Sequence, residues 1–121
     1  MNQELDHLPI EVKNGELVTR YIEWGDMAVR YVRVPAGTDF GPVLEGLPDD
    51  RCPSDHWGLV LEGSLLLTHA DGSDERTPAG AAYHWPAGHT ASTDEDTAFL
   101  EVGPLTPMRQ FHHHVTGGTP D

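Results

Sequence analysis

The chain has 121 residues, of which 20 are acidic and 7 are basic, so its formal net charge is −13 with histidine neutral. This length predicts a single domain over residues 1–121, and the charge excludes nucleic acid and anionic membrane surfaces as partners, because both repel an acidic protein. Apolar residues make up 37% of the chain, which is enough to build a core, and a single cysteine excludes an intrachain disulfide.

The first residues and the apolar segments indicate a cytoplasmic protein. Residues 1–6 are polar and acidic, without the basic start or the apolar stretch of a signal peptide. The longest apolar run, residues 59–67, is interrupted by Glu62, Gly63 and Ser64 and is too short to span a membrane.

Short strand-like segments, separated by turn residues, follow one another through most of the chain. The expected strands are residues 17–24, 27–34, 56–61, 64–69, 74–77, 81–85, 89–93 and 97–102. Gly25-Asp26 and Asp71-Gly72 predict hairpins, and the acidic residues 94–96 predict a third, between the last two strands. This series of short strands with regular turn signals predicts an all-β antiparallel barrel or sandwich, with its core over about residues 16–103.

One helix is expected near the C-terminus, over about residues 106–115. Thr106 is a favourable N-cap, Pro107 fits the first helical position, and the Gly117-Gly118 pair ends the pattern. Its apolar stripe follows helical spacing and consists of Met108, Phe111, His112 and Val115. We expect this stripe to pack on the outside of the barrel or on a partner subunit. His112, His113 and His114 would point in three directions on a helix, so they are not expected to bind one metal ion together.

In the middle of the chain, Gly80, Pro86 and Gly88 follow a spacing of Gly, five residues, Pro, one residue and Gly, and residues 60–63 read Val-Leu-Glu-Gly. The spacing is similar to that of the second cupin motif, in which Gly, Pro and Gly precede a His, and residues 60–63 are similar to the end of the first cupin motif. The chain therefore resembles the cupins over about residues 27–102. The resemblance implies a jelly-roll barrel, here with a short C-terminal helix. Small cupins include dioxygenases, isomerases, lyases and cyclases, so it implies no single reaction.

The usual cupin metal ligands are replaced in this chain. The first motif would place two His and a Glu where the chain has Asp50, Cys52 and His56, and the His of the second motif falls at Ala91. His89 lies two residues before Ala91 and therefore on the same face of the strand. The resemblance thus implies a changed site in the barrel cavity that contains Cys52, His56 and His89.

The metal expected at this site depends on its third ligand. Cys52, His56 and His89, completed by water, form the open donor set of a catalytic zinc site. If a carboxylate from Asp50 or Glu101 replaces the thiolate, two His and one carboxylate suit Fe(II) or Mn(II). The sequence leaves the divalent metal open among Zn, Fe, Mn and Ni, and it also leaves open that these residues only fill the core.

Further residues near these positions are expected to line the cavity. They are Trp57, Tyr83, His84, Trp85 and Glu101. The aromatic members have an alternative role, since such residues also fill cores and dimer contacts.

These observations favour a homodimer with a small cavity at one end of each barrel. The first hypothesis is metal-dependent chemistry on a small organic molecule, with the ion held by His56 and His89. The alternative is a non-catalytic module that binds a small molecule without metal, and a third is an interaction protein whose cavity is vestigial. The substrate and the reaction are not encoded in any motif that we recognise.

Overall fold

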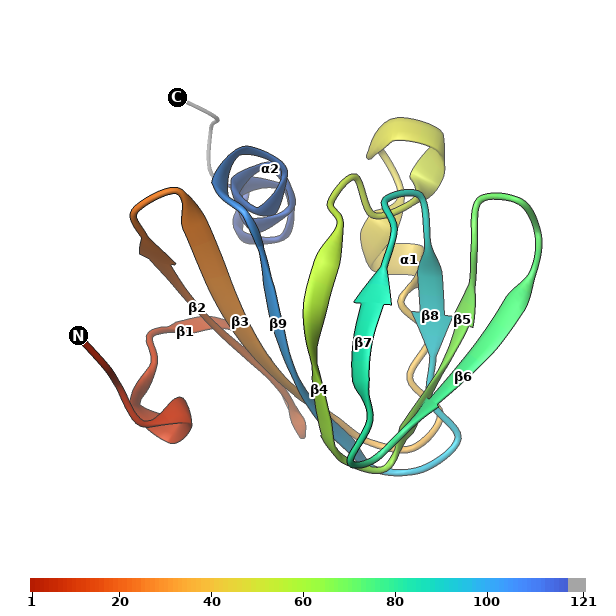
Figure 1. Cartoon of the computed structure of the whole chain (residues 1–121), viewed down its shortest axis with the longest axis horizontal. Helices are drawn as coiled ribbons and strands as arrows, with labels where there is room; N and C mark the ends of the chain where they lie inside the picture. Colours follow the sequence, from red (N-terminus) through yellow and green to blue (C-terminus); the bar gives the residue numbers. More distant parts are fainter. Residues whose placement is uncertain (118–121) are drawn as a thin grey trace.

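The computed structural model describes residues 1–117, which form nine strands and two helices (Figure 1). In chain order these are β1 (Ile10–Asn14), β2 (Leu17–Trp24), β3 (Met27–Val34), α1 (Gly41–Leu44), β4 (His56–Glu62), β5 (Ser64–Thr68), β6 (Asp74–Pro78), β7 (Ala82–Trp85), β8 (Thr90–Ser92), β9 (Thr97–Pro104) and α2 (Leu105–Thr116). Short 3-10 turns lie at Leu5–His7 and Pro48–Asp50. Within these residues no helix has both the length and the apolar character needed to cross a membrane.

The strands form two antiparallel sheets that converge at one end and diverge at the other (Figure 1). The larger sheet has the order β1-β2-β3-β9-β4-β7, and the smaller has the order β6-β5-β8. Both helices lie toward the open end, at the top of Figure 1. The all-β antiparallel class predicted from the sequence, with one C-terminal helix, is confirmed.

Most of the predicted strands lie where the sequence placed them. β2 and β3 pair across Gly25-Asp26, and β5 pairs with β6 around Asp71-Gly72, so two of the three expected hairpins are confirmed. β1 was not expected, because its five residues include Glu, Lys and Asn and carry no clear alternation. It adds an edge strand to the larger sheet through its pairing with β2.

The expected hairpin between the last two strands is wrong. β8 pairs with β5 in the smaller sheet, whereas β9 lies between β3 and β4 in the larger one. β9 forms eight residue pairs with β3. β8 has only three residues, so a hairpin with it would give β9 far fewer backbone pairs. Residues 94–96 therefore cross from one sheet to the other.

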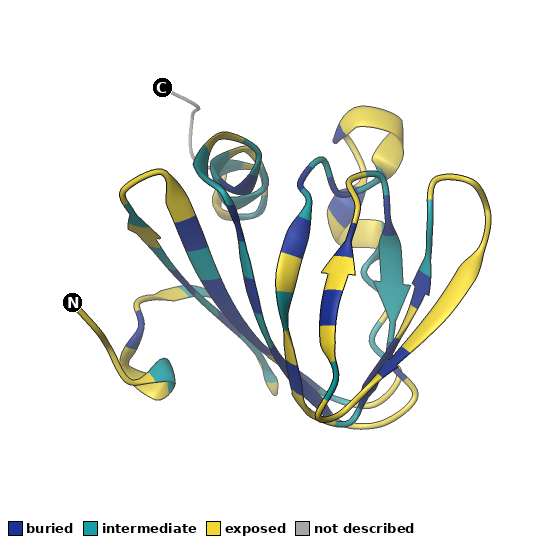
Figure 2. Cartoon of the chain, viewed as in Figure 1, coloured by how far each residue is buried: buried dark blue, intermediate teal, exposed yellow. Residues whose placement is uncertain are grey.

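The main core lies between the facing sheets, and strand alternation decides which side chains enter it (Figure 2). Its buried members are Val32, Val34, Val60, Leu65, Leu67, Tyr83, Trp85 and Phe99. The opposite face of β3 is also covered, because Tyr31 packs there against Leu8 of the N-terminal segment and Ala98 of β9. The larger sheet is therefore packed on both faces around β3 and β9, and this fixes the inward side chains of these strands.

Helix α2 begins one residue earlier than the sequence predicted. Pro104, the last residue of β9, takes the N-cap position that was expected for Thr106, because the chain passes from strand to helix without a loop. Gly117 ends the helix as expected, in the left-handed conformation (φ 73°), while Gly118 lies outside the described residues.

The expected packing of α2 on the outside of the barrel is wrong. Met108 is fully buried against Tyr21 and Ala28, which share the inward face of the larger sheet with Val32. α2 therefore covers the open end of the space between the sheets (Figure 1), and Phe111 from this helix reaches the cavity described below.

Candidate metal centre

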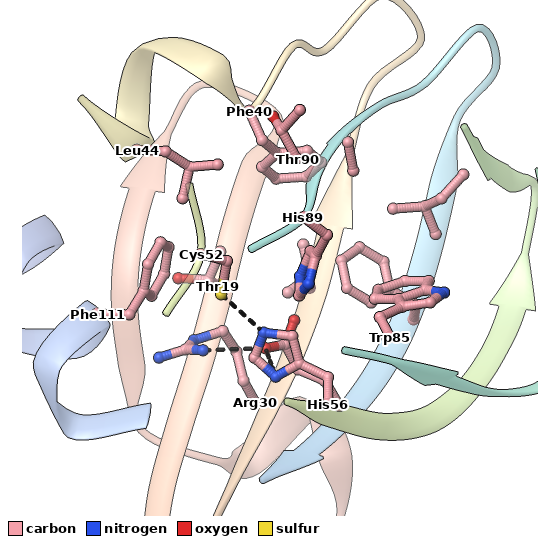
Figure 3. Close-up of a pocket in the computed structure, with 15 residues that line it drawn as sticks. Thr19, Arg30, Phe40, Leu44, Cys52, His56, Trp85, His89, Thr90 and Phe111 are labelled. Carbon is pink, nitrogen blue, oxygen red and sulfur yellow. Dashed lines mark hydrogen bonds and ion pairs between the residues drawn. The ribbon is translucent and has the colours of Figure 1, made fainter. Parts of the chain in front are cut away.

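Cys52, His56 and His89 converge in a cavity between the two sheets (Figure 3). All three are buried, and one potential ligand atom from each lies within 4.8 Å of the other two. Cys52 precedes β4, His56 is its first residue, and His89 directly precedes β8. The structure thus brings together residues that the sequence singled out from segments 33 residues or more apart.

A backbone bridge fixes Cys52 beside His89. The Cys52 N–H donates to the His89 carbonyl oxygen (3.0 Å), and the Gly88 N–H donates to the Cys52 carbonyl oxygen (2.7 Å). Gly88 has a φ of 91°, which a residue with a side chain rarely adopts. The Pro86-Ala87-Gly88 turn, whose spacing carried the family resemblance, therefore positions two of the three residues.

The ring of His89 presents an unprotonated nitrogen. Its Nδ1 lies 2.7 Å from the Pro86 carbonyl oxygen, which can only accept, so Nδ1 carries the proton. Burial and the neighbouring His56 lower the pKa of His89 to about 4, so the ring is neutral at pH 7. Nε2 is then left with a free lone pair, as a metal ligand requires.

His56 lies between the thiol of Cys52 and the carboxyl group of Glu101. Its Nε2 is 3.0 Å from Cys52 Sγ, and its Nδ1 is 3.1 Å from Glu101 Oε2. Nδ1 is buried but is not aligned for a hydrogen bond to Glu101, so it has no hydrogen-bond partner. Burial and the charge of Arg30 lower the pKa of His56 to about 3. A small turn of this neutral ring would pair Nδ1–H with Glu101 and leave Nε2 free beside Cys52.

Glu101 is held by a buried ion-pair cluster, here called the Arg30 clamp, which consists of Glu11, Arg30 and Glu101. Arg30 Nε and Nη2 donate to the two carboxylate oxygens of Glu11 at 2.9 and 3.0 Å, and Nη1 donates to Glu101 at 3.1 Å. The guanidinium carbon lies 4.9 Å from the centre of the Tyr21 ring and 4.6 Å from that of Phe111. Arg30 is therefore fixed by ion pairs in its plane and by aromatic rings near it.

The groups around the three candidate ligands have shifted pKa values. Burial alone would raise the pKa of Glu11, but Arg30, His112 and Thr19 together outweigh it and the pKa is lowered. At Glu101 burial outweighs Arg30, and the pKa is raised. Burial and the negative charge of Glu101 raise the pKa of Cys52 to about 12, so the thiol needs a nearby cation to ionise. A bound metal ion is such a cation.

The cavity itself is small and mostly apolar, with a volume of about 70 Å³. Besides the three candidate ligands it is lined by Thr19, Arg30, Val32, Phe40, Leu44, Leu65, Trp85, Thr90, Ala91, Phe99, Glu101 and Phe111. Trp85 and Glu101, two of the residues expected at the cavity, are among these lining residues.

Three other predicted cavity residues do not line it. Trp57 and His84 occupy paired positions on β4 and β7 and stack on the outer face, with ring centres 4.8 Å apart. Their prediction is wrong because alternation along β4 turns His56 inward and its neighbour outward. Tyr83 is buried, but it packs against Trp85 in the core, and its hydroxyl donates to the Leu100 carbonyl oxygen (2.8 Å).

Asp50, the other candidate carboxylate, is not part of the cluster. It is exposed, and its Oδ1 accepts a hydrogen bond from the Gly46 N–H (2.9 Å). Glu101 is therefore the carboxyl group that lies next to the candidate ligands.

The sequence did not single out Glu11, Arg30 or His112 for the site. Arg30 shares one face of its strand with the apolar residues Ala28, Val32 and Val34, and a charged residue in such a row is the signal that could have revealed a buried pair. Glu11 gave no signal because its strand was not predicted. His112 Nδ1 lies 2.6 Å from Glu11 Oε2, so this histidine contacts the Arg30 clamp. Within residues 1–117, Cys52, His56 and His89 are the one cluster with metal-binding geometry.

No protein-family profile and no curated protein sequence matches the chain. Solved structures do. A protein with a double-stranded β-helix domain from Klebsiella pneumoniae is 18% identical at a TM-score of 0.61, covering 85% of this chain and 88% of that one. An RmlC-like cupin from Shewanella frigidimarina is 14% identical at 0.60, covering 86% and 90%.

HppE, solved in an Fe(II) form, is 17% identical to this chain at a TM-score of 0.59. The similarity covers 85% of this chain and 59% of HppE. These likenesses agree with the two facing antiparallel sheets and with the glycine and proline turns read from the sequence. The chain therefore has the cupin fold, the double-stranded β-helix.

Proposed function

We propose that the chain binds one divalent transition-metal ion through Cys52 Sγ, His56 Nε2 and His89 Nε2, and that this centre acts on a small organic molecule. The observation that carries the proposal is the convergence of three buried donor atoms within 4.8 Å. The orphaned Nδ1 of His56 beside Glu101 supports it, because a carboxylate behind a histidine ring is the usual partner of a ligating histidine.

Charge balance supports an ion of charge +2. When an ion displaces the proton of the Cys52 thiol and both glutamates of the Arg30 clamp are ionised, three negative charges would face the one positive charge of Arg30. Two buried negative charges in excess are costly unless a cation neutralises them. One divalent ion supplies the missing charge, and the thiolate among its ligands favours zinc over the harder ions Mn(II) and Fe(II).

The chemistry that such an ion supplies when bound is Lewis-acid polarisation of a ligand or ionisation of water. The residues of the chain orient the ligands and exclude solvent. The Pro86 carbonyl fixes the ring of His89, Glu101 stands behind His56, and the apolar walls keep bulk water away from the centre. The similarity to HppE, which was solved in an Fe(II) form, supports metal binding by this chain, and iron stays a second candidate.

Elemental analysis of the untagged protein tests the proposal, and we expect about one equivalent of metal per chain. Cys52→Ser, His56→Gln and His89→Gln should each weaken binding by more than the ~10–100-fold that loss of an outer partner costs. His84→Gln, which changes an exposed histidine on the neighbouring strand, should leave affinity unchanged. Metal retained in the double variant His56→Gln/His89→Gln, but lost in His113→Gln/His114→Gln, would move the site to α2 and contradict the proposal.

A second candidate function is the binding of a small molecule without metal. The apolar lining of the cavity supports it, because such walls hold a ligand by exclusion of water. Two results together would favour this function. The protein would contain no metal after expression and bind none on titration, and a small apolar ligand would stabilise it.

The homodimer and the cytoplasmic location stay predictions. The outer face of β4 supplies an apolar strip for a second copy to cover, since Trp57, Leu59 and Leu61 are 44%, 37% and 42% exposed. Exposed large apolar side chains at successive outward positions are typical of a protein contact.

A further inference from the structure

Residues 41–51, which begin with α1, form a loop whose two ends are tied to the same short stretch of chain. At one end the Phe40 N–H donates to the Ala91 carbonyl oxygen (3.0 Å), and at the other the Cys52 N–H donates to the His89 carbonyl oxygen (3.0 Å). These two acceptors are two residues apart in the sequence, which is ~7 Å in an extended chain. Compact surface loops whose ends lie close together are frequently functional.

Between its ends the loop is held by apolar packing rather than by hydrogen bonds to the barrel. Within the described part of the chain, every hydrogen bond of residues 41–50 has both partners between positions 39 and 51. Leu44 and Leu47 are the buried side chains of this stretch, and they pack in a small cluster with Cys52. The loop is therefore a cover over Cys52 that is firmly fixed only where it begins and ends.

Helix α2, the other element at the open end, is anchored by more kinds of contact. Its Met108 is fully buried, and Arg109 Nε and Nη2 donate to the Glu23 carboxylate at 3.0 and 2.8 Å. His112 Nδ1 lies 2.6 Å from Glu11 Oε2, and the helix continues directly from β9. Of the two elements at the open end (Figure 1), the loop is therefore the one that can move away with the smaller loss of contacts.

The loop also lies where access to the candidate ligands is needed. Cys52, His56 and His89 are all buried, so a metal ion or a small ligand needs an opening to reach them. Leu44 and Phe40 lie at the end of the cavity away from His56 (Figure 3). An outward movement of the loop would carry Leu44 away from this end and uncover Cys52.

We infer that residues 41–51 form a lid, which swings outward about its two tied ends while the barrel and α2 stay folded, and that this opening gives access to Cys52 and the cavity. The inference goes beyond the proposed function, because it concerns the metal-free protein as well. Such local opening costs less than global unfolding, since most of the core stays buried.

The reactivity of Cys52 tests the inference directly, because it is the one cysteine of the chain. The metal-free protein is mixed with an excess of the disulfide reagent DTNB at fixed pH, and labelling is followed at urea concentrations below the unfolding transition. Local opening exposes little surface, so the labelling rate should hardly change with urea. We expect it to be about 10-fold or more above the rate that global unfolding would allow.

Two variants that each lose hydrogen bonds near the surface separate the lid from α2. Asp50→Ala removes the acceptor of the Gly46 N–H (2.9 Å) within the lid and places alanine at a φ of 55°, so labelling should become about 3–10-fold faster. Arg109→Gln is the matched control, because it breaks the ion pair of α2 with Glu23 and leaves the lid intact. It should leave the labelling rate unchanged.

Three outcomes would overturn the lid. They are a labelling rate that rises with urea as steeply as global unfolding does, an unchanged rate in Asp50→Ala, and an acceleration in Arg109→Gln as large as in Asp50→Ala. The last would mean that α2 or the whole barrel opens instead. Because labelling is done without metal, its result does not depend on whether the proposed metal site exists, and failure of one proposal is distinguishable from failure of the other.

Discussion

At the scale of single residues, Glu101 connects the candidate centre to the rest of the protein. Its Oε2 lies 3.1 Å from His56 Nδ1 on one side and 3.1 Å from Arg30 Nη1 on the other. Arg30 thus holds the carboxyl group in the position from which it can orient the histidine ring. A histidine oriented in this way keeps its lone pair directed at the metal.

Glu101→Gln should weaken metal binding by ~10–100-fold, because the amide keeps the shape of the side chain but cannot supply the carboxylate charge behind His56. Competition with a chelator of known affinity measures the change. Glu62→Gln is the matched control, since Glu62 is exposed and pairs with Arg33 at 3.2 Å. An unchanged affinity in Glu101→Gln would show that Glu101 does not orient His56.

At the scale of the strands, β4 holds His56 in place because it packs tightly between β7 and β9. Gly58 lies at the closest point of this contact, where a Cβ atom would collide with the Leu100 carbonyl oxygen and the Tyr83 hydroxyl. The hydrogen bond from Tyr83 to Leu100 passes over this glycine (2.8 Å). β4 can therefore carry no larger residue at this position without moving its neighbours.

Gly58→Ala should lower the free energy of unfolding by about 3 kcal/mol, the upper end of the cost of overpacking, because backbone and a rigid ring must shift. Urea-induced unfolding measures it. Gly41→Ala, at the half-buried start of α1, is the control: the new Cβ would meet only the Asp39 carboxylate, at 3.2 Å, and stability should change by less than ~0.5 kcal/mol because that side chain can move. A loss as small in Gly58→Ala as in Gly41→Ala would mean that the sheet accommodates the methyl group.

The sequence predicted correctly those elements whose structure depends on a local pattern of residues. The β2–β3 hairpin follows from alternation and a turn of two residues, and the candidate ligands follow from motif spacing. The partner of β8 depends on contacts far along the chain, so a short acidic turn was read as a hairpin. Trp57 and His84 were misplaced because one step along a strand reverses the face of a side chain.

At the scale of the whole molecule, the buried histidines make stability depend on pH. His56 and His89 have folded-state pKa values of about 3 and about 4, below the unfolded value of ~6.5. Below pH ~6.5 the unfolded chain therefore binds more protons than the folded one. Their contribution to stability is complete above this pH, is lost as pH falls toward 4, and changes no further below the folded values.

The metal-free protein should thus lose ~1.4 kcal/mol of stability per pH unit for each of these histidines between pH ~6.5 and ~4.5. Denaturant unfolding at several pH values measures the slope. His56→Gln/His89→Gln should have a shallower slope in this window, whereas His7→Gln/His84→Gln, which replaces two exposed histidines, should keep the original slope. Equal slopes in all three proteins would show that the buried rings do not resist protonation.

The Arg30 clamp has a consequence for the order in which the protein folds. Its members and His112 are distant along the chain, since the sequence separation is 71 for Arg30 and Glu101 and 101 for Glu11 and His112. Contacts at such separations cost much loop-closure entropy and are expected after local hairpins such as β2–β3. We expect the metal site to mature as one of the last events of folding, so metal would bind the nearly complete barrel rather than nucleate it.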